Sequence, residues 1–316
     1  MADVDIIIVN YRSAAHTAAC IGAARAVMAS DGVTAAVYVE NNGDDPAELE
    51  RAVAEAGGAV VSHNPANLGF GAACNAGAAR GGSEFILILN PDTRLKAGCL
   101  SACLALLRTT ANVGIVGPEL QNHSGEPLAS CSPLPTPFDL LARTAGLHVL
   151  RKGQSNYPFL SPAAHNASGY VGQIMGAVML VRRSLFRDLG GFDPRYFLYF
   201  EDVDLCSRAA AIGMRCYYLK QAHAIHFGRA SSSKDAGMAL ALFLRSALTY
   251  ARAHFGVGPQ IALGLASYLI ELPLRLLRTP FGGAGIMGGD VLRAYALLSR
   301  SLLTGVSIPN LARRAR

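Results

Sequence analysis

The chain has 316 residues, of which 51% are hydrophobic and 16% are charged, so it can bury a sizeable core and disorder is excluded. Its seven cysteines are odd in number and form no C-x-x-C pair, which favours a reduced, cytoplasmic protein over a disulfide-rich secreted one. The net charge of +6 is concentrated in the tail, because from Gly237 onward nine Arg and no Lys stand against Glu271 and Asp290. This argues against a nucleic-acid groove on the main domain and predicts contact of the tail with an anionic surface. The N-terminus lacks the basic region of a signal peptide.

Short apolar runs alternate with Ala-rich segments through the first part of the chain. Strands are predicted at 4–9, 35–39, 59–62, 85–89 and 113–116. Helices are predicted between them, the first capped by Ser13 and the second starting at Asp45-Pro46. Alternation of this kind indicates right-handed βαβ units and a mostly parallel sheet.

The run Phe85 to Leu89 reads as a strand buried on both faces, and it ends in Asn90-Pro91-Asp92. Pro91 cannot donate to a sheet ladder, so Asn90 and Asp92 are presented at a carboxyl edge, where open α/β sheets bind their ligands. Hard oxygen donors there suit Mg²⁺ or Mn²⁺ holding a diphosphate. A plain turn at the end of the strand is the alternative.

Two earlier strands also end in polar residues, in Asn10-Tyr11 and in the run from Glu40 to Asp44. The segment Asn67 to Gly71 follows the third strand and suggests a dinucleotide fingerprint. The fingerprint fails, because its third glycine would fall at Cys74 and because it does not follow the first strand. A hydride-transfer dehydrogenase is therefore disfavoured.

The segment 118–169 holds seven of the fifteen prolines and predicts a long surface excursion, an acceptor loop or a lid. An apolar strand is expected to resume over 172–181. It carries Gly176-Ala177, small residues that let a ligand approach the backbone closely.

An aromatic run then leads into Glu201, Asp202 and Asp204, at the start of a helix predicted over 202–212. Acidic residues in a first turn are stabilised by the helix dipole. An aromatic wall beside a carboxylate is also a way to bind a sugar and to raise the pKa of a general base. A strand over 215–219 follows, and after it His226, an imidazole that can join a carboxylate on Mn²⁺.

From Ala236 the chain predicts helices rich in Leu, Ala and Arg, broken at 256–259 and 280–289. The longest apolar run, 261–270, ends at Glu271 and is too short to span a bilayer, which needs about 20 residues. An interfacial helix on a membrane and a helix packed on the domain or on a second copy of the chain stay open as alternatives.

Taken in chain order, these motifs resemble glycosyltransferase family 2 and are most similar to those of bacterial rhamnosyltransferases. The resemblance covers about 220 residues and rests on Asn10-Tyr11, Glu40 to Asp44, Asn67 to Gly71 with Asn75, Asn90-Pro-Asp92, Gly176-Ala177, Phe200 to Leu205, and His226. It implies an α/β GT-A fold, Rossmann-like with a mostly parallel sheet flanked by helices. The catalytic domain would comprise residues 1–235, with a C-terminal helical extension over 236–316.

The resemblance also implies the chemistry. Asp202 would be the general base of an inverting transfer, and Asp92 with His226 would hold Mg²⁺ or Mn²⁺ on the donor diphosphate. The substrate would be bound by Asn10, Tyr11, Glu40, Asn41, Asn67, Gly69, Phe70, Asn75, Asn90, Gly176, Ala177 and Glu201, with Glu40 and Asn41 on the pyrimidine base.

By the same resemblance, the expected donor is a nucleotide sugar, dTDP-rhamnose. The expected acceptor is a glycan or a polyprenyl-diphosphate-linked sugar at the inner face of the plasma membrane. UDP- or GDP-linked donors, and a catalytically silent sugar-nucleotide-binding subunit, are the alternatives.

Overall fold

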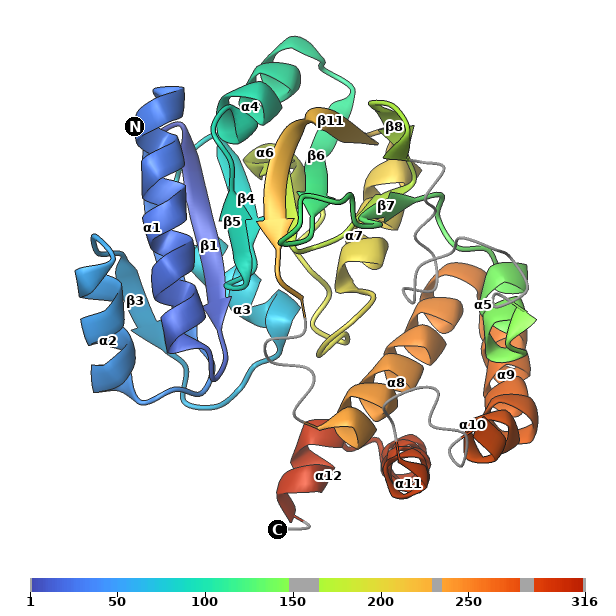
Figure 1. Cartoon of the computed structure of the whole chain (residues 1–316). Coiled ribbons are helices and arrows are strands. Elements are labelled where there is room, and N and C mark those ends of the chain that lie inside the picture. The colour runs from blue at the N-terminus through green and yellow to red at the C-terminus, as the bar shows by residue number, and fades with distance from the viewer. Residues whose placement is uncertain (1, 148–164, 229–234, 279–286, 315–316) are drawn as a thin grey trace. The chain divides into compact units, whose positions relative to one another are not determined.

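The computed structural model describes residues 2–147, 165–228, 235–278 and 287–314, and forms two compact units (Figure 1). Unit 1 comprises Met1–Leu134, Ser155–Phe197 and Glu201–Ser231. Unit 2 comprises Pro135–Gln154, Leu198–Phe200 and Ser232–Arg316.

A nine-stranded sheet forms the centre of unit 1, within the described residues, in the order β3-β2-β1-β4-β10-β6-β11-β5, with β8 paired to β11. Strands β1 to β4 pair in parallel, and β10 runs antiparallel to both β4 and β6. The bounds are β1 Val4–Asn10, β2 Ala35–Asn41, β3 Val60–His63, β4 Phe85–Leu89, β5 Thr93–Leu95, β6 Val113–Gln121, β8 Gly169–Val171, β10 Val178–Arg182 and β11 Arg215–His226. A separate small sheet pairs β7 (Cys131–Ser132) with β9 (Gln173–Ile174).

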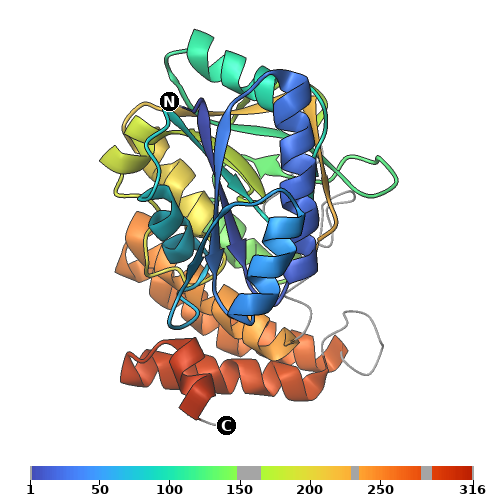
Figure 2. The same ribbon diagram turned by 90° about the vertical axis from the view of Figure 1, so that its left-hand side faces the viewer.

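Helices cover both faces of this sheet, as Figure 2 shows from the side. Successive residues of β1 explain the two layers, because Ile6 and Ile8 join one core cluster while Ile7 and Val9 join the other. The first cluster takes in α1 (Ala14–Asp31), α2 (Pro46–Glu55) and α4 (Cys99–Thr109); the second takes in α3 (Phe70–Ala78), α6 (Arg183–Asp188) and α7 (Glu201–Ala211).

The charged residue inside β1 is satisfied by partners from distant parts of the chain. Asp5 is almost fully buried, and its carboxylate accepts hydrogen bonds from the backbone and hydroxyl of Ser83 and from the guanidinium of Arg183. A buried carboxylate needs such partners, so this cluster fixes β1 against the start of α6.

Three predicted strands differ from the observed ones. The strand expected over 172–181 is two strands, β9 and β10, separated at Met175–Ala177. The strands expected over 113–116 and 215–219 run on to Gln121 and His226, because they pair with each other along their length. Pro118 is accommodated within β6 where the β6–β11 register shifts, between Leu219 and His223.

The predicted proline-rich excursion contains regular structure as well as irregular chain. It includes β7 and the helix α5 (Pro137–Thr144), whose N-terminus is a capping box of Thr136 and Asp139. The part of the expected loop or lid over 148–164 lies outside the described residues. All seven cysteines are buried, and none of them forms a disulfide among the described residues.

The regular structure of unit 2 is helical over its described residues. Besides α5, its helices are α8 (Ala236–Phe255), α9 (Val257–Ala266), α10 (Leu272–Arg278), α11 (Gly288–Thr304) and α12 (Ile308–Arg314), and a π-helical turn, η4 (Ser267–Glu271), joins α9 to α10. The apolar run 261–270 therefore lies inside a longer helical segment than the run itself. The π turn lies directly before Pro273, which lacks an N–H, and the helix continues. Val257–Arg278 is the one described segment long and apolar enough to cross a membrane.

Candidate active site

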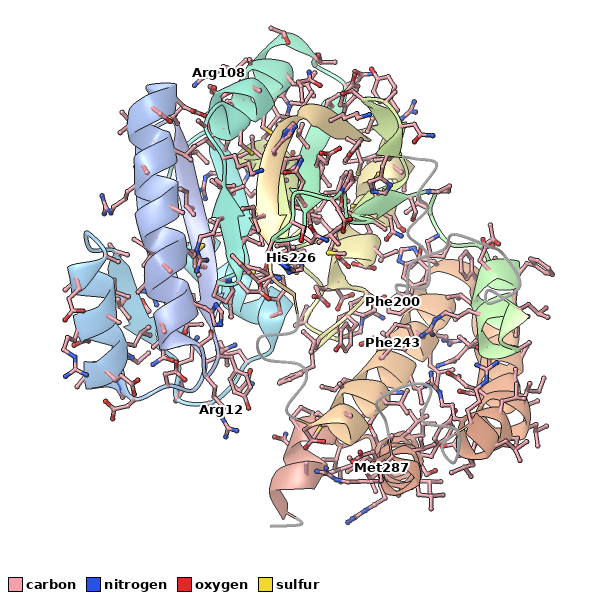
Figure 3. All side chains as sticks on the ribbon, in the orientation of Figure 1. Arg12, Arg108, Phe200, His226, Phe243 and Met287 are labelled. Carbon is pink, nitrogen blue, oxygen red and sulfur yellow. The ribbon has the colours of Figure 1, made fainter. Side chains whose placement is uncertain are left out.

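The carboxyl edge of the sheet in unit 1 brings Asp92 and His226 together. Strand β5 begins just after Asp92 and pairs antiparallel with the end of β11, so that Thr93 lies opposite His226. His226 Nε2 lies 3.4 Å from Asp92 Oδ1, and both side chains are largely buried. Figure 3 shows His226 at this end of β11.

The break between β9 and β10 connects this edge to the acidic helix. The backbone N–H of Asn90 donates to the carbonyl of Ala177 at 2.9 Å. The next residue back, Gly176, donates its N–H to Asp202 Oδ2 at 2.8 Å. Two adjacent residues of one segment therefore place the end of β4 and the start of α7 side by side. The side-chain amide of Asn90 has no hydrogen-bond partner among the described residues and is available to a ligand.

Asp202 has the surroundings of a tuned base. Burial raises the pKa of its carboxyl group above the ordinary value of 3.8, while the N–H groups of Gly176 and Val203 oppose that rise. The chain enters α7 through Tyr199 and Phe200, which have φ of 69° and 67°. Two successive left-handed non-glycine residues cost roughly 1–3 kcal/mol each, and such strain concentrates at functional sites.

Glu201 does not face solvent as a substrate ligand would. It is buried, its Cβ lies near Gly71 at the start of α3, and its Oε2 atom is enclosed without a hydrogen-bond partner among the described residues. Burial, and then the neighbouring charge of Asp202, raise the pKa of Glu201 well above its usual range. The geometry favours a protonated Glu201 beside an ionised Asp202.

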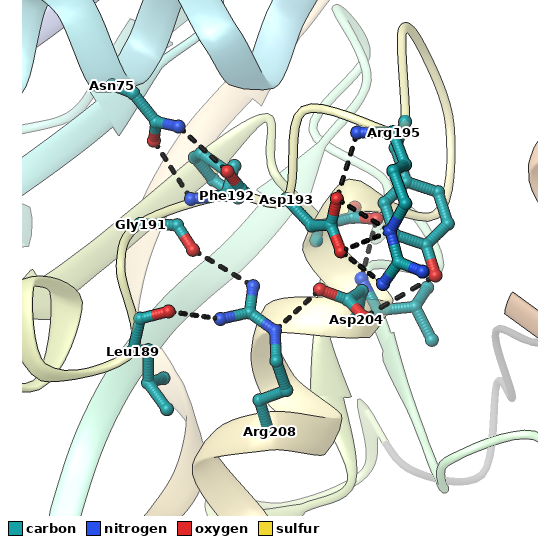
Figure 4. A network of polar contacts seen from close by, with 11 residues as sticks. Asn75, Leu189, Gly191, Phe192, Asp193, Arg195, Asp204 and Arg208 are labelled. Carbon is teal, nitrogen blue, oxygen red and sulfur yellow. Dashed lines mark hydrogen bonds and ion pairs between the residues drawn. The ribbon is translucent and has the colours of Figure 1, made fainter. Parts of the chain in front are cut away.

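The third carboxylate of the run has a structural partner. Asp204 Oδ2 accepts a hydrogen bond from Arg208 Nε at 2.7 Å, one turn along α7. Arg208 also donates to the carbonyls of Leu189 and Gly191, which holds the loop before the aromatic run (Figure 4).

Three rings of the aromatic run expected beside these carboxylates are buried, whereas Phe197 and Tyr199 are half-buried. Phe192 and Tyr196 are buried in unit 1, where Phe192 packs on Phe186 with ring centroids 5.5 Å apart. Phe200 belongs to unit 2 and lies 5.4 Å from the ring of Phe243. These rings are core residues because the loop turns them inward, a direction that the sequence pattern does not reveal.

The amide of Asn75 clamps the same loop. Its Nδ2 donates to the carbonyl of Phe192 at 2.7 Å, and its Oδ1 accepts from the N–H of Phe192 at 2.8 Å (Figure 4). Both ends of the amide are thus used inside the protein. Asn75 positions the loop that leads to α7, and in this conformation it presents nothing to a substrate.

The loops after β1 and β2 form a second, densely bonded group of predicted residues. Asn10 is fully buried; its Nδ2 donates to Asn41 and Asp44, and its Oδ1 accepts from Ser13 and Thr17. Asn41 in turn bonds the backbone of Asp44. These amides are satisfied internally and act by holding the two loops together.

Asp44 is a residue that the sequence analysis did not assign to the site. Its Oδ2 accepts from the N–H groups of Ser13 and Ala14, both at 2.9 Å, and so caps α1 from another loop. The predicted cap, Ser13, makes no side-chain capping bond. The polar run after β2 was the available signal.

Glu40 is fully buried at the end of β2, and its oxygens accept hydrogen bonds from Arg80 at 3.0 Å and Asn64 at 3.3 Å. Asn64 also donates to Asn42, whose own amide donates to the carbonyl of Gly69. The structure thus connects the predicted base-contacting residues to the loop before α3. Tyr11 differs from this group, because its half-buried ring lies over Gly43 and its hydroxyl has no hydrogen-bond partner in the described part of the chain.

Other parts of the protein pack against the loop before α3. Asn67 Oδ1 accepts from the N–H of Gly69, and the N–H of Phe70 donates to the carbonyl of Phe197 at 2.9 Å. Gly69 has φ of 88°, and an added Cβ would collide with that same carbonyl. The helix N-terminus is therefore covered, and it does not offer the open cradle that a dinucleotide pyrophosphate requires.

The donor set at the sheet edge fits a divalent metal held jointly with a substrate. One carboxylate and one imidazole lie within reach of each other at Asp92 and His226. No group of three or more His, Cys, Asp or Glu side chains forms a metal site in the described part of the chain. Mg²⁺ and Mn²⁺ sites of this kind complete their coordination with phosphate oxygens and water.

Comparisons with known proteins now decide the family. Residues 2–241 match the sequence profile described as glycosyltransferase like family 2. The chain belongs to glycosyltransferase family 2. This confirms the resemblance and the enzyme class, and it sets aside the dehydrogenase interpretation.

Two curated proteins illustrate the similarity. The chain is 29% identical over 226 residues to the N-acetylglucosaminyl-diphospho-decaprenol L-rhamnosyltransferase of Mycobacterium tuberculosis, covering 66% of this chain and 72% of that protein. It is 40% identical over 75 residues to the rhamnosyltransferase WbbL of Escherichia coli K12, covering 24% of this chain and 28% of that protein.

Solved structures confirm the predicted fold. A mannosyltransferase from Pyrobaculum calidifontis, solved with GDP-Man and Mn²⁺, aligns with a TM-score of 0.53 at 17% identity and covers 100% of this chain and 79% of that one. GalNAc-T7, solved with UDP, GalNAc and Mn²⁺, aligns with a TM-score of 0.50 at 13% identity over 73% of this chain and 44% of that one. The fold is GT-A.

Proposed function

We propose that this glycosyltransferase moves rhamnose from dTDP-rhamnose to a hydroxyl group of a glycan or of a polyprenyl-diphosphate-linked sugar, with inversion, in the synthesis of cell-surface polysaccharide. The names of the two curated relatives support the donor sugar and the lipid-linked class of acceptor. The observation that carries the reaction type is the Gly176–Ala177 segment, which joins Asp202 to the end of the strand that bears Asp92.

In this proposal Asp202 accepts the proton of the acceptor hydroxyl as its oxygen attacks the anomeric carbon. The bond between that carbon and the diphosphate oxygen breaks from the opposite face, and its electron pair leaves with the nucleoside diphosphate. The Gly176 N–H, which donates to Asp202 Oδ2, would fix the orientation of this carboxylate. Asp92 and His226 would hold the divalent metal, which offsets the charge developing on the leaving group.

The predicted donor-binding residues form two groups, according to whether their side chains are hydrogen-bonded within the protein. Asn10, Asn41, Glu40 and Asn75 act by holding loops, because their polar atoms bond within the protein. Tyr11 and Asn90 have no side-chain hydrogen bond among the described residues and, unlike Glu201, are not buried. We assign direct donor contact to these two first, with the Tyr11 ring facing the base.

A screen of nucleotide sugars tests the proposal. The purified full chain is incubated with dTDP-rhamnose, or with UDP- and GDP-linked sugars, in Mn²⁺, in Mg²⁺ or in EDTA. The acceptor is N-acetylglucosaminyl-diphospho-polyprenol, and Asp202→Asn is the matched control. The expected result is metal-dependent transfer of rhamnose by the parent alone.

Turnover with a UDP- or GDP-linked sugar instead would overturn the donor assignment and keep the reaction type. Metal-dependent binding of a nucleotide sugar without turnover on any acceptor would favour the silent binding subunit.

A further inference from the structure

The helical segment Val257–Arg278 in unit 2 carries an apolar stripe that faces solvent. Val257, Ile261, Leu265 and Leu269 stand four residues apart, so each turns about 40° around the helix from the one before and together they form one sector. Their exposed fractions are 48%, 55%, 57% and 72%. Only 17% of the most apolar window of this segment is buried.

The opposite side of the same segment is packed within unit 2. Leu263, Ser267 and Glu271 are buried. Ser267 donates to Glu271 Oε2 at 3.0 Å, and its carbonyl accepts from the hydroxyl of Tyr295 on α11 at 2.9 Å. The segment is thus fixed on one side and bare on the other.

The charges around the stripe have a single sign. No Asp, Glu, Lys or Arg occurs from Ala253 to Ile270; the exposed Arg278 ends the segment, and the exposed Arg252 lies on α8, five residues before the segment begins. The only carboxylates after Gly237 are Glu271, which is buried and bonded to Arg275, and the half-buried Asp290. An apolar sector flanked in sequence by exposed arginines matches the surface of a lipid bilayer, in which anionic headgroups cover an apolar interior.

We propose that Val257–Arg278 docks this protein on an anionic lipid bilayer, with the helix lying in the plane of the interface. Ile261, Leu265 and Leu269 enter the boundary between headgroups and acyl chains, about 5–10 Å deep. Arg252 and Arg278 contact lipid phosphates. This inference goes beyond the transfer reaction and does not depend on which sugar is transferred.

A second copy of the chain fits this surface less well. In a two-fold symmetric dimer the same patch faces itself, so the arginines that flank it in sequence would meet the arginines of the other copy. The described residues of the tail offer no exposed carboxylate to balance them.

A membrane-crossing helix also fits less well, although 22 residues extend about 33 Å. The buried face is bonded to α11, which carries Arg293 and Arg300, both exposed. Insertion across the bilayer would either strand Glu271 and Ser267 without their partners or draw these arginines into the hydrocarbon core.

Vesicle co-sedimentation of the full chain, without donor or acceptor, tests the docking. Binding is compared on phosphatidylglycerol-containing and pure phosphatidylcholine vesicles, at low and high salt. The double variant Leu265→Ser/Leu269→Ser is expected to bind anionic vesicles at least about tenfold more weakly, since it removes two Leu side chains that would be buried in the bilayer. The matched control is Val60→Ser/Ile212→Ser, which removes similarly exposed apolar side chains from unit 1 and should bind like the parent.

Arg252→Gln/Arg278→Gln tests the charges. It should weaken binding to anionic vesicles and reduce the dependence of binding on salt, with no change on neutral vesicles. Thermal unfolding of each variant establishes that the fold is kept.

The absence of Trp from the chain allows a direct measurement of depth. Single Trp residues are placed at Ile261 or Leu277, with Ile212→Trp as control, and quenching by lipids brominated at different depths is recorded. Equal, shallow depths at the first two positions are expected for a helix in the plane.

Equal binding to neutral and anionic vesicles, or unchanged binding by Leu265→Ser/Leu269→Ser, would overturn the proposal. A deep Ile261→Trp probe with a shallow Leu277→Trp probe would replace it with a crossing helix. A concentration-dependent dimer that the serine variant abolishes, without vesicle binding, would assign the surface to a second copy. Because no substrate is present, failure of the transfer assay does not bear on these results.

Discussion

At the scale of single residues, the carboxylates of α7 have separate tasks. Asp202 is bonded to the Gly176 N–H, whereas Asp204 is bonded to Arg208. We expect Asp202→Asn to keep donor affinity and to lower turnover by about 10²-fold or more, the scale of losing a general base. Asp204→Asn is the control, and it should lower thermal stability without shifting the pH profile. Near-normal turnover of Asp202→Asn would move the base to Glu201.

Asp92 is assigned to the metal because of its distance to His226. Asp92→Ala should weaken binding of dTDP about tenfold or more in Mn²⁺ and leave binding in EDTA unchanged, since roughly 1.4 kcal/mol or more of metal-mediated contact would be lost. Calorimetric titration with and without metal measures both affinities. Equal affinity of variant and parent in Mn²⁺ would show that Asp92 is not a ligand.

Burial of Glu201 predicts that substituting this residue changes the melting temperature in a pH-dependent way. A carboxyl whose pKa is raised on folding stabilises the protein fully below its unfolded pKa, and that contribution is lost as the pH rises. Glu201→Gln removes the titration, so its melting temperature should match the parent near pH 4 and exceed it increasingly toward pH 8. A constant difference across this range would mean that Glu201 does not titrate as its burial implies.

At the scale of elements, one amide holds the entry to α7. Asn75→Ala leaves the N–H and carbonyl of Phe192 without their partner, which should destabilise the protein by about 1–3 kcal/mol. If the residue positions the loop, the melting temperature and kcat fall while the KM for donor changes little. A raised KM for the donor at an unchanged melting temperature would instead indicate that Asn75 contacts the substrate directly, as its motif predicts.

The elements show what the sequence could predict. Phe85–Leu89 is recognisable because a strand buried on both faces is continuously apolar, and Pro91 marks its end. The continuation of β11 past Leu219 is not recognisable, because Lys220 and Gln221 read as a turn, and the pairing with β6 that extends the strand is long-range. The break at Met175–Ala177 is not recognisable either, because its apolar residues continue the sequence pattern of a strand.

For the candidate site, the sequence suggested residues with the right chemistry but did not reveal the partners to which their side chains are bonded. The strand-end position of Asp92 and its chemistry indicated a ligand site, and the family pattern added His226. The side-chain amides of Asn10 and Asn75 are hydrogen-bonded to other loops, through contacts between segments far apart in the chain. Such contacts leave no local signal.

At the scale of the whole molecule, the chain passes between its two units more than once. Pro135–Gln154 and Leu198–Phe200 belong with the C-terminal helices, although the sequence places both inside the predicted catalytic domain. Composition marks the start of the helical tail near Ala236, because Leu, Ala and Arg become frequent there. It does not mark Leu198–Phe200, the three residues that directly precede Glu201 and Asp202.

This organisation predicts that the chain cannot be cut after residue 235 without loss. Phe200 is buried, with the rings of Phe243 and Tyr250 both 5.4 Å away, and Leu140 is buried in the same unit. Truncation would expose both, and each large apolar side chain contributes about 1.5–3 kcal/mol when buried. The truncated protein should aggregate or melt several degrees lower, and it should lose turnover because Phe200 adjoins Glu201 and Asp202. Removal of 308–316 alone is the control for a shortened C-terminus. A soluble protein ending at 235 with the parent's melting temperature and kcat would show that unit 1 sets the position of α7 by itself.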